Sequence, residues 1–263
     1  VFVHMNQEYI LISGIIWKLT GKKVYLWYNH YSGNFLTNIS ALFCNKIFFT
    51  SKSAYTSRFS QSVQMPVGVN TDIFKTSTRD TDRKLIKILF LARIAKSKRL
   101  EDLIRALSLQ PLVDMKWHIR VTGPTISLDD KLYLLKCKKE IEDLNLTSRF
   151  TFTDGVSFSE TPSLYSTHDI FINCSKSGMY DKTIFEAAAS GCIVISSSSD
   201  YKSEAGSDFF FNFGHHSELS DRLVYMINQP NENWDTYKRH MIKIANNHSL
   251  KNLSKKIISE IYG

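Results

Sequence analysis

Short apolar runs alternate with helix-like segments through most of this 263-residue sequence. Strands that are joined by helical crossovers pair in parallel, so the alternation predicts an α/β fold built on parallel sheets. We expect strands near residues 1–4, 23–28, 45–50, 62–65, 85–91, 116–122, 149–153, 169–173, 192–196 and 208–211. We expect helices near residues 6–20, 34–43, 52–59, 99–109, 128–144, 160–166, 182–190, 215–228, 232–247 and 249–262.

One polar stretch interrupts the alternation and divides the chain. Residues 76–84 contain no apolar side chain and follow a turn-like segment, which is typical of an interdomain linker. We therefore predict a first domain over 1–75, a second over 85–247 and a C-terminal helix over 248–263. Val1-Phe-Val resembles the interior of a buried strand, so we expect the first domain to be partial, with its missing piece N-terminal.

Composition restricts the class of protein. Hydrophobic residues make up 43% and charged residues 22%, as in ordinary globular proteins. The four cysteines form no C-x-x-C pair and have no histidine at ligand spacing, so we expect no metal and a reduced, cytoplasmic setting. The longest apolar run, Tyr9 to Trp17, is too short to span a bilayer.

The net charge of +8 suits nucleic acid, an anionic membrane surface or a phosphorylated substrate. The sequence shows no strand on which aromatic and basic residues interleave, which argues against a nucleic-acid partner. Docking on an anionic membrane, at its inner face, remains compatible with the charge, as does a solvated basic surface.

Two cations follow the apolar run that begins at Ile88. Arg93 and Lys98 stand between this predicted strand and the helix that opens near Leu100. Open parallel sheets bind ligands at the carboxyl ends of their strands, and two cations there suit a diphosphate. The alternative is that both are surface charges beside a loop.

A second strand, loop and helix run from Ile170 to Gly191. Asp181 is a candidate N-cap of the helix. The backbone N–H groups of Lys182, Thr183 and Ile184 would then form an anion site at the helix N-terminus.

Helical spacing places further residues on defined faces of this helix. Lys182 and Glu186 are four residues apart and share one face, whereas Ile184, Phe185 and Ala188 turn inward. A cation and a carboxylate would line one crevice. A solvated salt bridge between the two side chains is an equally good interpretation.

Three segments, taken together, resemble a known family. ILFLARIAKSKRLEDLIRAL (88–107), RFTFTDGVSFSETPSLYSTHDIFINCS (149–175) and YDKTIFEAAASGCIVIS (180–196) are similar, in order and spacing, to the group 1 glycosyltransferases, family 4 of the retaining GT-B enzymes. The resemblance covers roughly 85–200 and extends more weakly over 1–70. It implies two Rossmann-like, doubly wound domains, of which the N-terminal, acceptor-side one is partial here and the second binds a nucleotide sugar.

The resemblance also implies roles for single residues. Arg93 and Lys98 match the Arg and Lys that hold the donor diphosphate, and Glu186 matches the second Glu of a paired-glutamate motif that binds the nucleotide ribose. The first Glu of that motif is replaced by Gly178, which removes a contact to the donor sugar and leaves the sugar's identity open. Asp181 is placed to substitute for it or to cap the helix, and we favour the cap.

Candidates on the acceptor side are histidines. His4 and His30 follow the first two predicted strands, and His4 resembles the family's histidine near the reacting centre. A structural role for each is equally plausible. Asp80 and Asp82 form a D-x-D pattern, which we interpret as solvated charge in the linker because it does not end a strand.

The family's reaction moves a sugar from a nucleotide diphosphate sugar to an acceptor hydroxyl with retention of configuration. The resemblance therefore predicts a glycosyltransferase that uses a nucleotide sugar as donor, needs no cofactor, and acts on a glycan or lipid-linked acceptor, in cell-surface polysaccharide synthesis. Two alternatives stay open at this stage: a catalytically inactive nucleotide-binding or interaction module, and a sugar-nucleotide epimerase.

Overall fold

The computed structural model describes residues 1–76, 84–178 and 180–263. Most of the predicted linker, including Asp80 and Asp82, lies outside the described residues. The chain forms two compact units. The first comprises Val1–Val67, Ser177–Tyr180 and Lys251–Gly263, and the second comprises Gly68–Lys176 and Asp181–Leu250. Residues 68–75, which we assigned to the first domain, thus group with the second unit, and most of the C-terminal helix groups with the first.

The first unit is built on a parallel four-stranded sheet in the order β1-β2-β3-β4. Its strands are β1 (Phe2–His4), β2 (Tyr25–Trp27), β3 (Lys46–Phe49) and β4 (Ser62–Gln64). Its helices are α1 (Glu8–Leu19), α2 (Phe35–Phe43), the 3₁₀ helix η1 (Tyr55–Arg58) and most of α10 (Leu250–Tyr262). The strands follow in chain order, so this sheet lacks the reversal of a doubly wound sheet among its described strands.

Apolar side chains cover both faces of this sheet. On the side of α1 and α2, Ile10 packs with Leu26 and Ile47. On the other side, Phe48 and Met65 pack against the apolar face of α10. Burial of these apolar surfaces holds the helices to the sheet.

The second unit is built on a parallel five-stranded sheet in the order β7-β6-β5-β8-β9. Its strands are β5 (Ile86–Leu91), β6 (Trp117–Thr122), β7 (Phe150–Thr153), β8 (Ile170–Asn173) and β9 (Ile193–Ser196). The strand order reverses between β5 and β8, which is the doubly wound arrangement. At such a reversal the two crossovers leave on opposite faces, and a crevice opens at the carboxyl ends of the strands.

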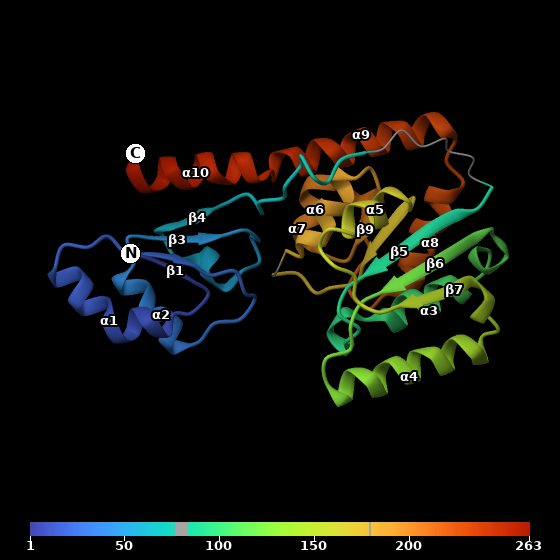
Figure 1. The fold of residues 1–263 in the computed structure, drawn as a ribbon, viewed down its shortest axis with the longest axis horizontal. Coiled ribbons are helices and arrows are strands. Elements are labelled where there is room, and N and C mark those ends of the chain that lie inside the picture. Colours follow the sequence, from blue (N-terminus) through green and yellow to red (C-terminus); the bar gives the residue numbers. More distant parts are fainter. Residues whose placement is uncertain (77–83, 179) are drawn as a thin grey trace. The chain divides into compact units, whose positions relative to one another are not determined.

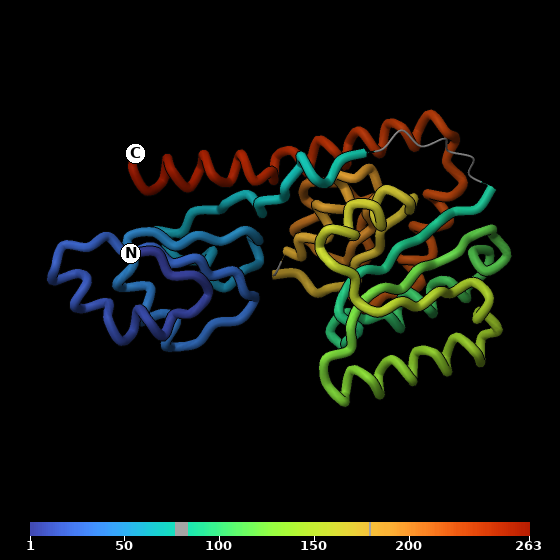
Figure 2. Tube along the Cα trace, in the orientation of Figure 1, coloured from blue at the N-terminus to red at the C-terminus, as the bar shows by residue number. Residues whose placement is uncertain are grey.

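Helices cover both faces of this second sheet (Figure 1). They are α3 (Leu100–Ser108), α4 (Leu128–Asp143), α5 (Thr161–Ser166), α6 (Lys182–Ala189), α7 (Ser199–Ala205), α8 (His216–Ile227) and α9 (Asn231–Asn247). The chain path in Figure 2 shows α3 and α4 on one face, while α6 and α9 lie together on the other. The predicted α/β class, with parallel sheets and a helical C-terminus, is confirmed.

Two parts of the second unit differ from the prediction. Residues 208–211 form no strand: the chain makes a 3₁₀ turn, η5 (Ser207–Phe209), and only an isolated bridge joins Phe210 to Ser196. Phe209, Phe210 and Phe211 are buried in the core, and this burial, not membership of the sheet, accounts for the apolar run. The polar segment 199–205 forms the helix α7, which Ser198 caps by accepting a hydrogen bond from the N–H of Tyr201.

Candidate functional site

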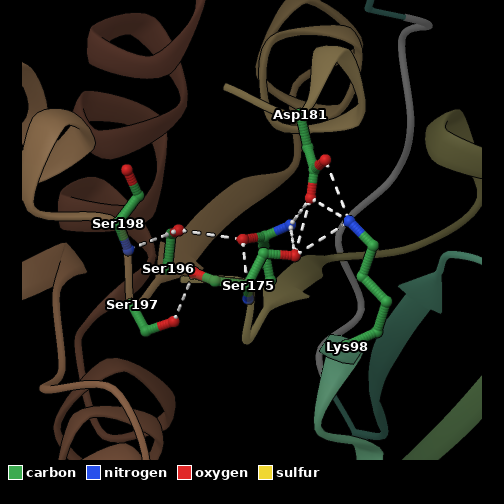
Figure 3. Close-up of polar contacts among 7 residues, drawn as sticks. Lys98, Ser175, Asp181, Ser196, Ser197 and Ser198 are labelled. Atoms are coloured by element: carbon green, nitrogen blue, oxygen red, sulfur yellow. Dashed lines mark hydrogen bonds and ion pairs between the residues drawn. The ribbon is translucent and has the colours of Figure 1, made fainter. Parts of the chain in front are cut away.

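The site lies where the strand order of the second sheet reverses. Lys98 ends the 3₁₀ turn η2 (Lys96–Lys98) that follows β5, and its Nζ lies 2.7 Å from Oδ2 and 2.9 Å from Oδ1 of Asp181. Ser175, two residues beyond β8, also accepts a hydrogen bond from this ammonium at 3.1 Å. The fold thus joins the ends of β5 and β8 to the start of α6 (Figure 3).

Hydroxyl and amide groups surround the Asp181 carboxylate. Ser175 Oγ donates to Oδ2 at 2.7 Å, and the Asn173 side-chain amide donates to the same oxygen at 2.9 Å. Asn173 Oδ1 in turn accepts from Ser196 Oγ at 3.3 Å, and Ser197 Oγ donates to the Ser175 carbonyl at 3.0 Å. The ion pair is therefore anchored through the ends of two neighbouring strands (Figure 3).

This environment keeps Asp181 ionised. Burial alone would raise the pKa of the carboxyl, but the Lys98 ammonium and the hydrogen bonds from Ser175 and Asn173 hold it below its ordinary value. Asp181 does occupy the N-cap position of α6, yet its side chain makes no capping hydrogen bond. The prediction that its side chain caps the helix was wrong, because the carboxylate forms an ion pair with Lys98 instead.

The N-terminus of α6 offers fewer N–H groups than we expected. The N–H of Ile184 donates to the Asp181 carbonyl at 3.1 Å, so it is not available to an anion. Within the described parts of the chain, the N–H groups of Lys182 and Thr183 donate to no acceptor. Two donors therefore remain at this helix end, together with the partial positive charge of the helix dipole.

Glu186 lies one turn further along α6 and is held by a buried phenol. Tyr165 Oη donates to Glu186 Oε2 at 3.1 Å, and burial raises the pKa of this carboxyl despite that bond and the nearby charge of Lys182. No ion pair within 4.0 Å joins Lys182 to a described carboxylate, so the alternative of a simple salt bridge does not hold. The inward side chains Ile184, Phe185 and Ala188 are buried, as the helical spacing predicts.

Arg93 has a different partner from Lys98. Its Nε lies 3.2 Å from Oδ2 of Asp130, and half of the Arg93 side chain is exposed. The same Asp130 oxygen accepts hydrogen bonds from the N–H groups of Ile126 and Ser127, where α4 begins. These backbone bonds, more than Arg93, hold the pKa of Asp130 below its ordinary value.

The remaining candidates belong to the first unit. His4 ends β1, is exposed, and stacks on Trp27 with ring centroids 6.2 Å apart. His30, just beyond β2, stacks on Tyr31 at 4.4 Å, and its Nδ1 lies 2.8 Å from Ser32 Oγ. Both lie at the carboxyl edge of the four-stranded sheet. Gly178 has a φ of 99°, in the region that favours glycine.

Sequence reasoning missed several members of the site. Asn173 carries a usable signal, since an amide at the end of an otherwise apolar strand has to find buried partners. Tyr165 carries no such signal, because an aromatic residue in a short helix is usually a core residue.

Among the described residues, no group of three or more His, Cys, Asp or Glu side chains is placed to hold a metal ion. None of the described helices is long and apolar enough to cross a membrane.

Comparison with known proteins identifies the family. The family model described as glycosyl transferases group 1 matches residues 70–259. The chain belongs to the group 1 glycosyltransferases. The predicted membership is thereby confirmed, and the matched range contains every site residue of the second unit.

One curated relative and several solved structures are also similar to this chain. The alpha-monoglucosyldiacylglycerol synthase of Streptococcus pneumoniae is 27% identical over 161 residues, which are 60% of this chain and 35% of that relative. The chain thus matches about a third of the length of this curated relative. The Anabaena protein HepE, solved in complex with UDP, is 16% identical with a TM-score of 0.85, covering 98% of this chain and 77% of that one. A Rickettsia africae glycosyltransferase is 18% identical with a TM-score of 0.81, covering 98% and 75%. These two structures show the fold.

Proposed function

We propose that this chain is the nucleotide-sugar-binding part of a retaining glycosyltransferase, which moves a sugar from a nucleotide diphosphate sugar to an acceptor hydroxyl. The observation that carries the proposal is the placement of the Lys98 ammonium beside the N-terminus of α6, at the strand-order reversal. A cation and two unbonded N–H groups at this point suit a diphosphate. Glu186, one turn along the helix, supplies a carboxylate for the ribose hydroxyls.

The chemistry follows from where negative charge develops. As the bond between the sugar carbon and the diphosphate oxygen breaks, Lys98, Arg93 and the N–H groups of Lys182 and Thr183 stabilise the departing diphosphate. The acceptor oxygen forms its bond to the same sugar carbon, and its proton passes to the leaving phosphate oxygen. This route retains configuration and requires no protein nucleophile. His4 and His30 are the candidates for contact with the acceptor.

A uridine nucleotide is the first donor to test. HepE has been solved with UDP, and the same protein has been solved with UDP and glucose.

The name of the Streptococcus pneumoniae relative describes a synthase of a glucosylated diacylglycerol, which suggests a lipid or lipid-linked acceptor. The net charge of +8 fits docking on an anionic membrane, where each well-placed Lys or Arg contributes about 1 kcal/mol. We infer a role in cell-surface glycan synthesis at the cytoplasmic face.

Calorimetric titration with UDP, GDP and ADP tests the donor site. We expect UDP to bind, and both Glu186→Ala and Arg93→Ala to weaken it about tenfold, the equivalent of one charge-assisted hydrogen bond. Lys139→Ala, an exposed change on α4, is the matched control and should leave the affinity unchanged. If none of the three nucleotides binds, the proposed donor site is wrong.

Gly178 favours a second candidate, a nucleotide-binding module that does not transfer sugar. It stands where the family has the first Glu of its paired motif, and its positive φ disfavours any side chain there. An assay with radiolabelled UDP-glucose separates the two candidates. Tight binding with neither transfer nor hydrolysis supports the inactive module, whereas turnover that depends on Arg93 supports the transferase.

A further inference from the structure

A polar pocket lies in the second unit, between α3 and α4. Its volume is about 350 Å³, which is within the range of small-molecule sites. The lining residues are Lys96, Arg99, Glu101, Arg105, Tyr133, Lys136, Cys137 and Glu140. None of these is a member of the donor site, although Lys96 shares the turn η2 with Lys98.

Two of the four lining cations are already paired. Arg99 Nη2 donates to Asp102 at 2.7 Å, and Arg105 Nε donates to Glu140 Oε1 at 2.6 Å. In contrast, neither Lys96 nor Lys136 has a described carboxylate within 4.0 Å. Both lysines are exposed. The pocket therefore holds two arginines fixed in its wall and two ammonium groups that lack an anion.

The pocket also offers oxygen acceptors. Glu101 accepts a hydrogen bond from the Tyr133 hydroxyl, and its Oε1 lies 3.8 Å from Arg99 Nη1. Glu140 uses Oε1 for Arg105, and its other oxygen has no donor among the described residues. Carboxylate oxygens in such positions accept hydrogen bonds from hydroxyl groups, which the polyol part of a sugar supplies.

We propose that this pocket binds a small phosphomonoester that carries hydroxyl groups, that is, a sugar phosphate or a similar polyol phosphate. Lys96 and Lys136 bind the phosphate oxygens through charge-assisted hydrogen bonds. Glu140 and Glu101 accept the ligand's hydroxyl groups. The site is separate from the donor site and does not depend on the proposed transfer reaction.

Calorimetric titration with glucose 6-phosphate, with inorganic phosphate and with glucose tests the proposal. We expect glucose 6-phosphate to bind best, inorganic phosphate to bind more weakly, and glucose not to bind. Lys96→Ala and Lys136→Ala should each weaken binding of glucose 6-phosphate at least about fivefold, because each removes one charge-assisted contact. Both are exposed lysines, so the thermal unfolding of the variants should stay as in the unchanged protein.

Two control variants locate the ligand. Lys139→Ala removes an exposed lysine of the same helix that does not line this pocket, and it should leave the affinity unchanged. Glu186→Ala alters the donor site and should also leave it unchanged. The proposal is overturned if glucose 6-phosphate does not bind at millimolar concentration, if Lys139→Ala weakens it as much as Lys136→Ala, or if Glu186→Ala abolishes it.

Discussion

The Lys98 ammonium lies 2.7 Å from Oδ2 of Asp181, although the two residues are 83 positions apart in the sequence. The side chains are only 22% and 19% exposed, respectively. A mostly buried charge requires a partner, so each of these residues depends on the other. The cation of the proposed donor site is thus held in place without a ligand, which would favour binding because less side-chain freedom is lost.

Removing either partner of this pair should destabilise the fold. Lys98→Ala leaves the Asp181 carboxylate without its cation, and we expect the free energy of unfolding to fall by about 2 kcal/mol. Asp181→Ala should cost a similar amount, and the double variant should cost less than the sum of the two. Urea denaturation measures all three. Strictly additive losses would show that the two side chains do not interact in solution.

The low pKa of Asp181 gives its contribution a pH dependence of known sign. A carboxyl whose pKa is lower in the folded state stabilises the protein above its unfolded value of about 3.9, and this stability is lost as pH falls through the lowered value. Asp181→Asn should therefore be less stable than the unchanged protein at pH 7. The difference should shrink in strongly acidic buffer, as measured by urea midpoints at each pH. A gap that widens with acid would contradict the assignment.

The sequence was enough to predict most strands and to select candidate site residues, but not the contacts that these residues make. Arg93 and Lys98 are recognisable because polar residues after a buried strand mark the carboxyl edge of a sheet. Glu186 is recognisable from its helical spacing to Lys182 and from the family resemblance. That Asp181 would bond to Lys98 and not to its own helix depends on two strands becoming neighbours, which no local pattern records. The same is true of Phe209, whose burial is decided by tertiary packing and not by strand periodicity.

Tyr165 should tune the ionisation of Glu186. Its hydroxyl donates to the carboxylate at 3.1 Å and so partly offsets the rise in pKa that burial causes. Tyr165→Phe removes this bond, and we expect the pKa of Glu186 to rise further, which carbon-detected NMR of the carboxyl group would follow. As the pH is lowered, donor binding by the variant should therefore begin to weaken at a higher pH than donor binding by the unchanged protein. An unaltered titration curve would mean that the phenol does not contact Glu186.

Arg93 should matter for the ligand much more than for the fold. Its side chain is 50% exposed, and exposed ion pairs contribute about 0–1 kcal/mol, so Arg93→Ala should change the unfolding free energy little. The same variant should bind UDP about tenfold more weakly, because a diphosphate offers this guanidinium a bidentate partner. Calorimetry and urea denaturation of one preparation give both quantities. A large loss of stability with unchanged affinity would assign Arg93 a structural role instead.

Gly178 should tolerate a side chain less well than another glycine with the same backbone angle. Gly178 and Gly206 both have a φ of 99°, but an added Cβ at Gly206 meets no atom within 4 Å, whereas at Gly178 it would lie 2.4 Å from the Cβ of Tyr31. Alanine at Gly206 should therefore cost only backbone strain, about 1–2 kcal/mol. Alanine at Gly178 should cost more, because Tyr31 has to move as well.

Thermal unfolding of Gly178→Ala beside Gly206→Ala makes this comparison directly. If Gly178→Ala is the more destabilised variant, a Glu at this position is incompatible with the loop as it stands. The contact to the donor sugar that the family's first Glu provides then has to come from another residue or be absent. If the two variants unfold at the same temperature, the loop accommodates a side chain, and Gly178→Glu becomes the variant in which to look for a gain in sugar binding.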